Sequence, residues 1–280
     1  MEKQIGLGLG IALGLGTAIL FNFLIAYLRK NPSTHNPGIN TLIQVGIMFL
    51  PAVPAYLWVW PNLQGSTQGT FQVLVYFYIL AGTILIGLQF YNWDQLGVNR
   101  SGIGLGLVYG ALLIAGRSLV VLSVDWKASL PAFNILTALG NLAYCLLIGI
   151  TEELLFRGLV YRALLEMRST RWAIWVSSIG FVLWHIFGQG PLVGAAMLLY
   201  GLIFALMRWR AGGITALIIT HALVDFFAFQ MLPDINVVDL GRPEVPHPFL
   251  LLAGLGLIAA TPLFLWLGHD KVFKLHDETI

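Results

Sequence analysis

The sequence predicts an all-α fold, a polytopic transmembrane helical bundle of eight or nine spans. Hydrophobic residues make up 58% of the 280 residues and charged residues only 10%, against roughly 25% in soluble domains. The apolar residues occur in runs of about 18 or more, the length at which a helix can cross a bilayer. These runs lack the alternation of apolar and polar residues that a membrane β-barrel needs. A single cysteine, Cys145, excludes an internal disulfide.

The candidate spans follow one another along most of the chain. The first is interpreted as a span and not as a signal peptide, because its long apolar stretch ends at Arg29 and Lys30 without a cleavage motif. Pro51 and Pro54 predict a kink or break in the second. The fifth is too long for one crossing, so we expect its end, from about Tyr161, in the cytoplasm. The sixth could be re-entrant, which keeps the count at eight or nine. The candidate spans are 5–28, 39–60, 71–90, 102–123, 133–167, 172–188, 190–209, 213–230 and 248–268.

We divide the chain into three parts. Residues 1–132 are N-terminal transmembrane helices, residues 133–230 form a core that carries the polar motifs, and residues 231–280 comprise an outer loop, the last transmembrane helix and a cytoplasmic tail. Two spans contain glycines at intervals of four, which predicts close packing of helices. A phosphate-binding loop is disfavoured there, because no strand precedes either run and neither completes GxGxxG. The glycines are Gly6, Gly10 and Gly14, and Gly102, Gly106 and Gly110.

The positions of the cations predict the orientation in the membrane. If the N-terminus is outside and all nine spans cross, ten Lys and Arg residues lie on the cytoplasmic side and only Lys3, Lys127 and Arg242 lie outside. An excess of cations marks the cytoplasmic loops of membrane proteins. We therefore expect an integral multi-pass protein of the bacterial plasma membrane, with its N-terminus outside and its C-terminus cytoplasmic. Arg208 and Arg210 are interpreted as cytoplasmic anchors.

Six ionisable side chains concentrate in three of the predicted spans, where each costs about 2.5–3.5 kcal/mol on insertion scales. Counted from the cytoplasmic ends at about 1.5 Å per residue, they lie deep enough to meet inside the membrane. We therefore expect one cluster, whose members face one another across the bundle. They are Glu152, Glu153 and Arg157 in the fifth span, His185 in the sixth, and His221 and Asp225 in the eighth.

The spacing within each motif suggests different roles for the two glutamates. Glu153 and Arg157 are four residues apart, so they share a helix face and are interpreted as a buried structural ion pair. Glu152 is rotated by about 100° from Glu153 around the helix and faces another direction. One carboxylate can thus be neutralised while the other faces a cavity as a general base.

Three motifs in successive polar spans resemble EExxxR, FxxxH and HxxxN/D of the CPBP family of intramembrane proteases. That family includes the CAAX-processing Rce1-type enzymes and the bacteriocin-processing and Abi-type proteins. The resemblance extends over about residues 133–230 and implies a glutamic endopeptidase with an all-helical fold. The matching residues are Glu152, Glu153 and Arg157, then Phe181 and His185, then His221 and Asp225.

The resemblance also implies roles for these residues. Glu152 with His185 would activate water, and His221 with Asp225 would stabilise the oxyanion. The Glu153–Arg157 pair would support the site. The implied substrate is a membrane-associated peptide or protein, with a prenylated CAAX-type end or a leader peptide. The expected partners are this substrate and the lipid bilayer, with no nucleic acid.

Position 225 leaves an alternative open. Many well-understood members have Asn there, which can donate a hydrogen bond, whereas ionised Asp225 cannot donate and would repel an oxyanion. Asp225 could be protonated, or it could orient His221 as a charged donor. We expect no cofactor, but the alternative is a zinc metalloprotease in which Glu152, His185, His221 and Asp225 bind the metal. A further alternative is a non-proteolytic membrane scaffold or regulator that keeps the fold.

Overall fold

The computed structural model describes residues 36–124 (except 53, 54 and 56–58), 134–231 and 247–267, with a few single positions between 23 and 30. All regular structure within these ranges is helical, and they contain no strand. The all-α prediction is thus confirmed. Most of the first predicted span, with its glycines, lies outside the described residues, as do the predicted outer loop and the tail.

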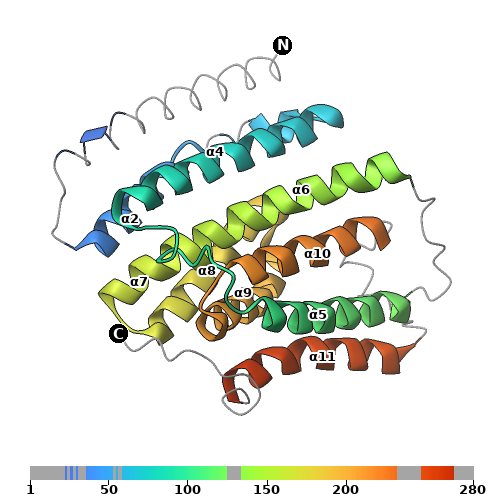
Figure 1. Ribbon diagram of the computed structural model, residues 1–280. Coiled ribbons are helices and arrows are strands. Elements are labelled where there is room, and N and C mark those ends of the chain that lie inside the picture. The colour runs from blue at the N-terminus through green and yellow to red at the C-terminus, as the bar shows by residue number, and fades with distance from the viewer. Residues whose placement is uncertain are drawn as a thin grey trace.

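The helices form one bundle in which successive long helices run in opposite directions (Figure 1). Helix α11 packs against α5, α5 against α10, and α10 against α6, while α8 and α9 pack together. The described elements are α2 (Pro37–Phe49), a 3-10 turn (Trp60–Asn62), α4 (Ser66–Phe90), α5 (Ile103–Val124), α6 (Ile135–Glu153), a π-helical segment (Leu154–Val160), α7 (Tyr161–Met167), α8 (Thr170–Gln189), α9 (Pro191–Ala211), α10 (Thr215–Met231) and α11 (Pro248–Leu267).

Local sequence explains where several helices begin and end. The Asn36 side chain caps α2 by accepting the Ile39 N–H at 3.1 Å, and Asn134 caps α6 in the same way. Helix α9 starts at Pro191, whose missing N–H costs nothing in the first turn. It ends at Gly212, whose φ of +67° is the left-handed conformation that glycine adopts readily.

Among the described residues, five helices are long and apolar enough to cross a membrane, by length and composition. Helices α2 and α10 are apolar but shorter, so the total of eight or nine spans stays a prediction. The second predicted span, 39–60, is not one helix, because α2 ends at Phe49 and a turn follows at Leu50 and Pro51. Proline lacks the N–H that would continue the helix, which is the break expected there. The spanning helices are Ser66–Phe90, Ile103–Val120, Ile135–Met167, Val193–Ala211 and Pro248–Leu267.

Two glycines of α5, Gly106 and Gly110, are points of close contact with α10. A Cβ placed on Gly106 would lie 2.5 Å from the Cβ of Ala216, and one on Gly110 would lie 3.1 Å from Oγ1 of Thr220. The Thr220 hydroxyl donates to the Gly106 carbonyl at 2.8 Å. The predicted packing through small residues is therefore confirmed for this helix pair.

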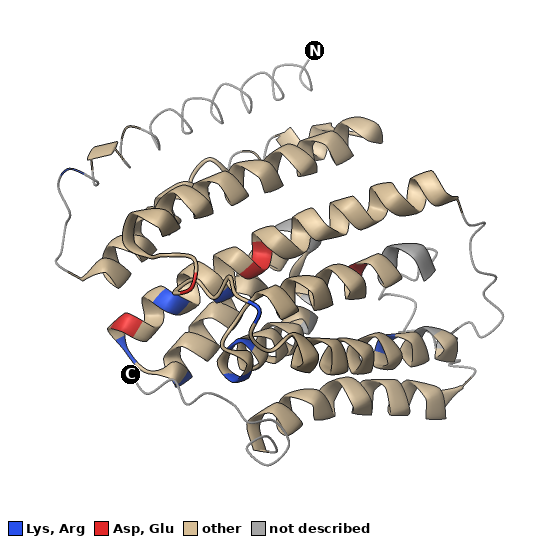
Figure 2. Cartoon of the chain, viewed as in Figure 1, with Lys and Arg blue, Asp and Glu red and all other residues tan. Residues whose placement is uncertain are grey.

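Most of the described Lys and Arg residues lie at one end of the bundle, where α7 and α9 finish and α8 and α10 start (Figure 2). We call this end the basic end. The termini of several helices are joined there: the Ile214 N–H donates to the Gly97 carbonyl at 2.7 Å, and Arg210 donates to the last carbonyls of α11, at Leu265 and Trp266. Loops distant in sequence thus bring the cations together.

Candidate active site

The Glu152–Glu153 pair lies where α6 changes from α-helical to π-helical geometry. Glu152 and Glu153 are the last residues of α6, and the π-helical segment that follows contains Arg157. All seven residues of this segment are buried. Such insertions are rare and occur frequently at functional sites. The first motif therefore lies in a specialised stretch of helix in the interior of the bundle.

Glu152 has two differently occupied carboxylate oxygens. Its Oε1 accepts the Tyr76 hydroxyl of α4 at 2.8 Å and the Trp184 indole N–H of α8 at 3.0 Å. Its Oε2 is buried and has no hydrogen-bond partner. This oxygen lies 3.9 Å from Nε2 of His185 and 3.8 Å from Nε2 of His221. One oxygen is therefore held by donors, while the other faces the two imidazoles.

Glu153 faces the other way, as its place on the helix predicts. Its Oε1 is 3.1 Å from Nη1 of Arg157 and 2.7 Å from Nδ1 of His221, and both acidic and basic side chains of the ion pair are fully buried. The predicted ion pair is thus present. The contact with His221 is an addition that spacing within one helix could not predict. Glu153 joins the first motif to the third.

The second motif orients its histidine within a single helical turn. Nδ1 of His185 lies 2.8 Å from the Phe181 carbonyl, four residues earlier in α8. A carbonyl oxygen can only accept, so Nδ1 carries the proton, and in the neutral ring Nε2 is an acceptor directed at Glu152. The Phe181 ring also packs on His185, with centroids 4.3 Å apart. Phe181 therefore fixes the orientation of the His185 ring, through its carbonyl and through its side chain.

His221 is held on three sides. Its Nδ1 faces Glu153, its ring stacks on Phe204 with centroids 5.0 Å apart, and its Nε2 lies 3.5 Å from Oδ2 of Asp225. Asp225 is the most exposed member of the cluster, with a quarter of its side chain accessible. All six predicted residues therefore meet in one place.

Arg157 is surrounded by aromatic rings and backbone oxygen. Its Nη2 donates to the Gly201 carbonyl of α9 at 3.1 Å, and its guanidinium carbon lies 4.3 Å from the centre of the Phe181 ring. Three carboxylates and this one guanidinium leave the cluster with an excess of two negative charges when both imidazoles are neutral. A proton gained by an imidazole would therefore reduce this excess of negative charge.

Arg208, interpreted from its position in the sequence as a cytoplasmic anchor, is buried in the bundle. Its side chain is 3% exposed, and its Nε donates to the carbonyl of Arg157 in the π-helical segment at 3.2 Å. Its guanidinium also lies over the Tyr161 ring. The position of Arg208 near the end of α9 resembles an anchor in sequence, but packing of α9 against the π-helical segment buries the side chain.

Sequence analysis missed four residues that complete the site: Tyr76, Trp184, Gly201 and Phe204. Of these four, only Trp184 could be linked to the site from the sequence, because it directly precedes His185 in the second motif. Tyr76 comes from a helix that carries none of the motifs, and Gly201 contributes only its backbone carbonyl.

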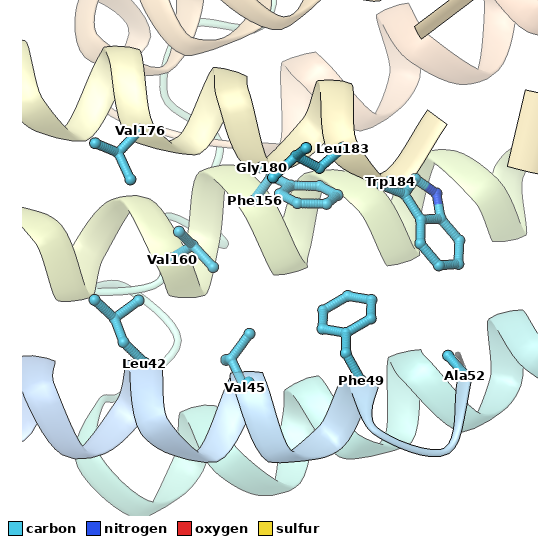
Figure 3. Close-up of a pocket in the computed structure, with 11 residues that line it drawn as sticks. Leu42, Val45, Phe49, Ala52, Phe156, Val160, Val176, Gly180, Leu183 and Trp184 are labelled. Atoms are coloured by element: carbon cyan, nitrogen blue, oxygen red, sulfur yellow. The ribbon is translucent and has the colours of Figure 1, made fainter. Parts of the chain in front are cut away.

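An apolar cavity of about 340 Å³ lies next to this cluster. Figure 3 shows that residues of α2 line one side of it and residues of α8 and the π-helical segment line the other. Phe49 and Trp184 face each other at one end, with ring centroids 5.8 Å apart. Trp184 therefore lines the cavity and also donates to Glu152. The cavity and the carboxylate are separated by a single side chain.

Metal binding was the alternative use of the cluster. Among the residues that the structure describes, no group of three or more His, Cys, Asp or Glu side chains is arranged to hold a metal ion. The nearest approach of the predicted ligands is the 3.5 Å between His221 and Asp225, with Glu152 at 3.8–3.9 Å from both histidines. Metal dependence stays a prediction.

One comparison with known proteins matches the region that contains the cluster. Residues 134–227 match the family model described as Rce1-like, type II CAAX prenyl endopeptidase Rce1-like. The matched segment begins at the cap of α6 and ends within α10, so it includes all three motifs. Comparisons with curated proteins and with solved structures found no match. This match supports the family predicted from the motifs: over residues 134–227, the chain is similar to the Rce1-like proteins.

Proposed function

We propose that the protein is an intramembrane endopeptidase that hydrolyses a peptide bond of a membrane-associated, prenylated substrate. One observation carries this proposal: the unpartnered oxygen of Glu152 faces Nε2 of His185 and of His221 in the interior of the bundle. Both separations, 3.9 and 3.8 Å, are too long for direct hydrogen bonds, and a water oxygen fits beside either line within reach of both atoms.

In the proposed reaction, Glu152 and His185 activate this water. The water oxygen forms a bond to the scissile carbonyl carbon, and the released proton passes to Oε2 of Glu152. The carbonyl π electrons move to the oxygen, which becomes an oxyanion. When the intermediate collapses, the C–N bond breaks and Glu152 returns the proton to the departing nitrogen. This is general base catalysis followed by general acid catalysis by the same carboxyl group.

His221 and Asp225 are the proposed stabilisers of the oxyanion. Nδ1 of His221 carries a proton that it donates to Glu153. For Nε2 to donate to the oxyanion as well, the ring must hold a second proton and be an imidazolium. Glu153 and Asp225 balance its positive charge. Asp225 then acts by orienting a charged donor and does not itself contact the oxyanion. This resolves the electrostatic conflict of an acidic side chain near a developing negative charge.

The apolar cavity suits the lipid part of such a substrate. Its lining consists of aliphatic and aromatic side chains and two glycines, and its volume is that of a small-ligand pocket. The family description names prenyl endopeptidases, and an isoprenoid chain is the apolar group that this cavity would hold. A chain seated there would place the attached peptide near Glu152, since Trp184 separates the two.

We also propose that the protein lies in the bacterial plasma membrane with the basic end in the cytoplasm. The placement of cations at the ends of α7 and α9 supports this orientation. Because α11 ends at the basic end, beside Arg210, the C-terminus is cytoplasmic in this orientation. Helix α2 packs on α7 and begins at the same end, so the first predicted span, if it crosses the membrane before α2, puts the N-terminus outside.

The test is cleavage of a farnesylated CAAX-type peptide by the purified protein in detergent, compared with the same peptide without the lipid. We expect cleavage of the lipidated peptide and much weaker cleavage of the other. Glu152→Gln should lower the rate roughly 10²–10⁴-fold, the contribution of general acid–base catalysis, while keeping the fold. Glu166→Gln, which alters an acid outside the cluster, is the matched control. Cleavage by Glu152→Gln at the wild-type rate would refute the proposed mechanism, and absence of cleavage of any peptide would favour the scaffold alternative.

A further inference from the structure

Two side chains outside the three motifs donate to the same oxygen of Glu152. The Tyr76 hydroxyl comes from α4 and the Trp184 indole N–H from α8, at 2.8 and 3.0 Å from Oε1. Tyr76 is a buried residue, and Glu152 is 2% exposed. Each donor belongs to a different helix, so two elements besides α6 hold the carboxylate.

This arrangement distinguishes the two oxygens chemically. A carboxylate oxygen has two lone-pair sites in its plane, and on Oε1 both are used by donors. Oε2 retains its lone pairs and faces the imidazoles. A proton taken from water can therefore go only to Oε2.

We propose that Tyr76 and Trp184 are positioning residues for the reaction, which keep Oε2 of Glu152 aimed at the two histidines. The inference rests on the proposed function, since it assigns Glu152 as the base. Without these donors, rotation of the carboxyl group would exchange the two oxygens and would let the carboxylate turn away from His185. Neither residue touches the reacting atoms, so both act through Glu152.

Aromatic packing keeps the two donors in place. The rings of Tyr76 and Trp184 meet edge to face, with centroids 6.1 Å apart, and Tyr144 packs edge-on against Tyr76 at 6.3 Å. On its other side, Trp184 meets Phe49 across the apolar cavity. Trp184 thus contacts both the cavity and the proposed base, whereas Tyr76 is not among the residues that line the cavity.

Kinetics on the farnesylated peptide separate the two roles. Tyr76→Phe removes only a hydroxyl, so kcat should fall roughly ten- to a hundredfold, the range for losing one hydrogen bond to a charged group, with KM unchanged. Trp184→Phe should lower kcat to a similar extent and also raise KM, because this residue lines the cavity. Tyr78→Phe is the control: it lies on the same helix and loses a hydroxyl that donates to the Met48 carbonyl at 3.0 Å. Wild-type kcat in Tyr76→Phe, or an equal loss in Tyr78→Phe, would overturn the proposal.

Infrared difference spectroscopy tests the same contact without any substrate. The carboxyl band of Glu152 is identified as the band that Glu152→Gln removes. It should shift in Tyr76→Phe and in Trp184→Phe but not in Tyr78→Phe. An unshifted band would overturn the positioning role whether or not the protein cleaves the peptide. A shifted band in a protein that cleaves no peptide would refute the proposed function and keep the hydrogen-bond arrangement.

Discussion

Replacement of Glu153 by Gln tests whether the buried ion pair and its contact with His221 stabilise the fold. The substitution keeps the shape and one acceptor oxygen but removes the negative charge beside a fully buried guanidinium. Removing one partner of a buried ion pair costs about 3–5 kcal/mol, because the other charge is left uncompensated. Arg157 keeps its bond to the Gly201 carbonyl and its contact with the Phe181 ring. We therefore expect the lower end of this range, about 3 kcal/mol.

The chain offers a matched control for this substitution. Arg162 and Glu166 form an ion pair with the same four-residue spacing and nearly the same separation, 3.2 Å, but their side chains are 30% and 22% exposed. Pairs of this kind contribute about 0–1 kcal/mol. Glu166→Gln thus makes the same chemical change at the same four-residue spacing, in a partly exposed pair whose charges run in the reverse order along the helix. Comparing the two variants tests how much the buried surroundings of Glu153 add.

The assay is the apparent melting temperature of each purified variant in the same detergent. A loss of about 3 kcal/mol corresponds to a fall of roughly 6–12 °C at 2–4 °C per kcal/mol. Glu166→Gln should lie within about 4 °C of the wild type by the same conversion. Equal shifts in the two variants would refute the assignment of Glu153 to a buried structural pair, as would a wild-type melting temperature in Glu153→Gln.

Three further outcomes are expected. Asp225→Asn should lower the cleavage rate, because the His221 imidazolium loses one of its two balancing carboxylates, and neither form should contain stoichiometric zinc. Stoichiometric zinc in the wild type, lost together with activity in the variant by elemental analysis, would establish the metalloprotease alternative. Gly106→Ala should destabilise the protein by about 1–3 kcal/mol through overpacking. Gly104→Ala, where an added Cβ meets nothing within 4 Å, should be neutral or stabilising, and equal melting temperatures for the two would contradict close α5–α10 packing. In a background without the native cysteine, Ser169→Cys should react with impermeant thiol reagents only from the cytoplasmic side and Gln64→Cys only from outside, and the reverse pattern would invert the proposed orientation.

The sequence alone determined the class of the fold and the members of the central cluster. Composition and the length of the apolar runs require a helical membrane protein, because only helices and closed barrels satisfy the backbone in lipid. Ionisable side chains inside such runs are costly unless they pair with one another. Their positions in three spans therefore predicted that they form one cluster. The separation of Glu152 from Glu153 followed from the 100° turn per residue of a helix.

Only the tertiary structure decided which atoms meet. The contact of Glu153 with His221, the donation of Tyr76 and Trp184 to Glu152, and the burial of Arg208 all join residues from different helices. Periodicity along one helix tells which face a side chain occupies, but the neighbouring helix and its rotation are set by packing over the whole bundle. No pattern in the sequence predicts the π-helical segment either. Its hydrogen bonds with α9, from the Arg157 side chain and to the Arg157 carbonyl, form only in the assembled bundle. The difference between the two oxygens of Glu152 is therefore a property of the assembled bundle and not of any motif.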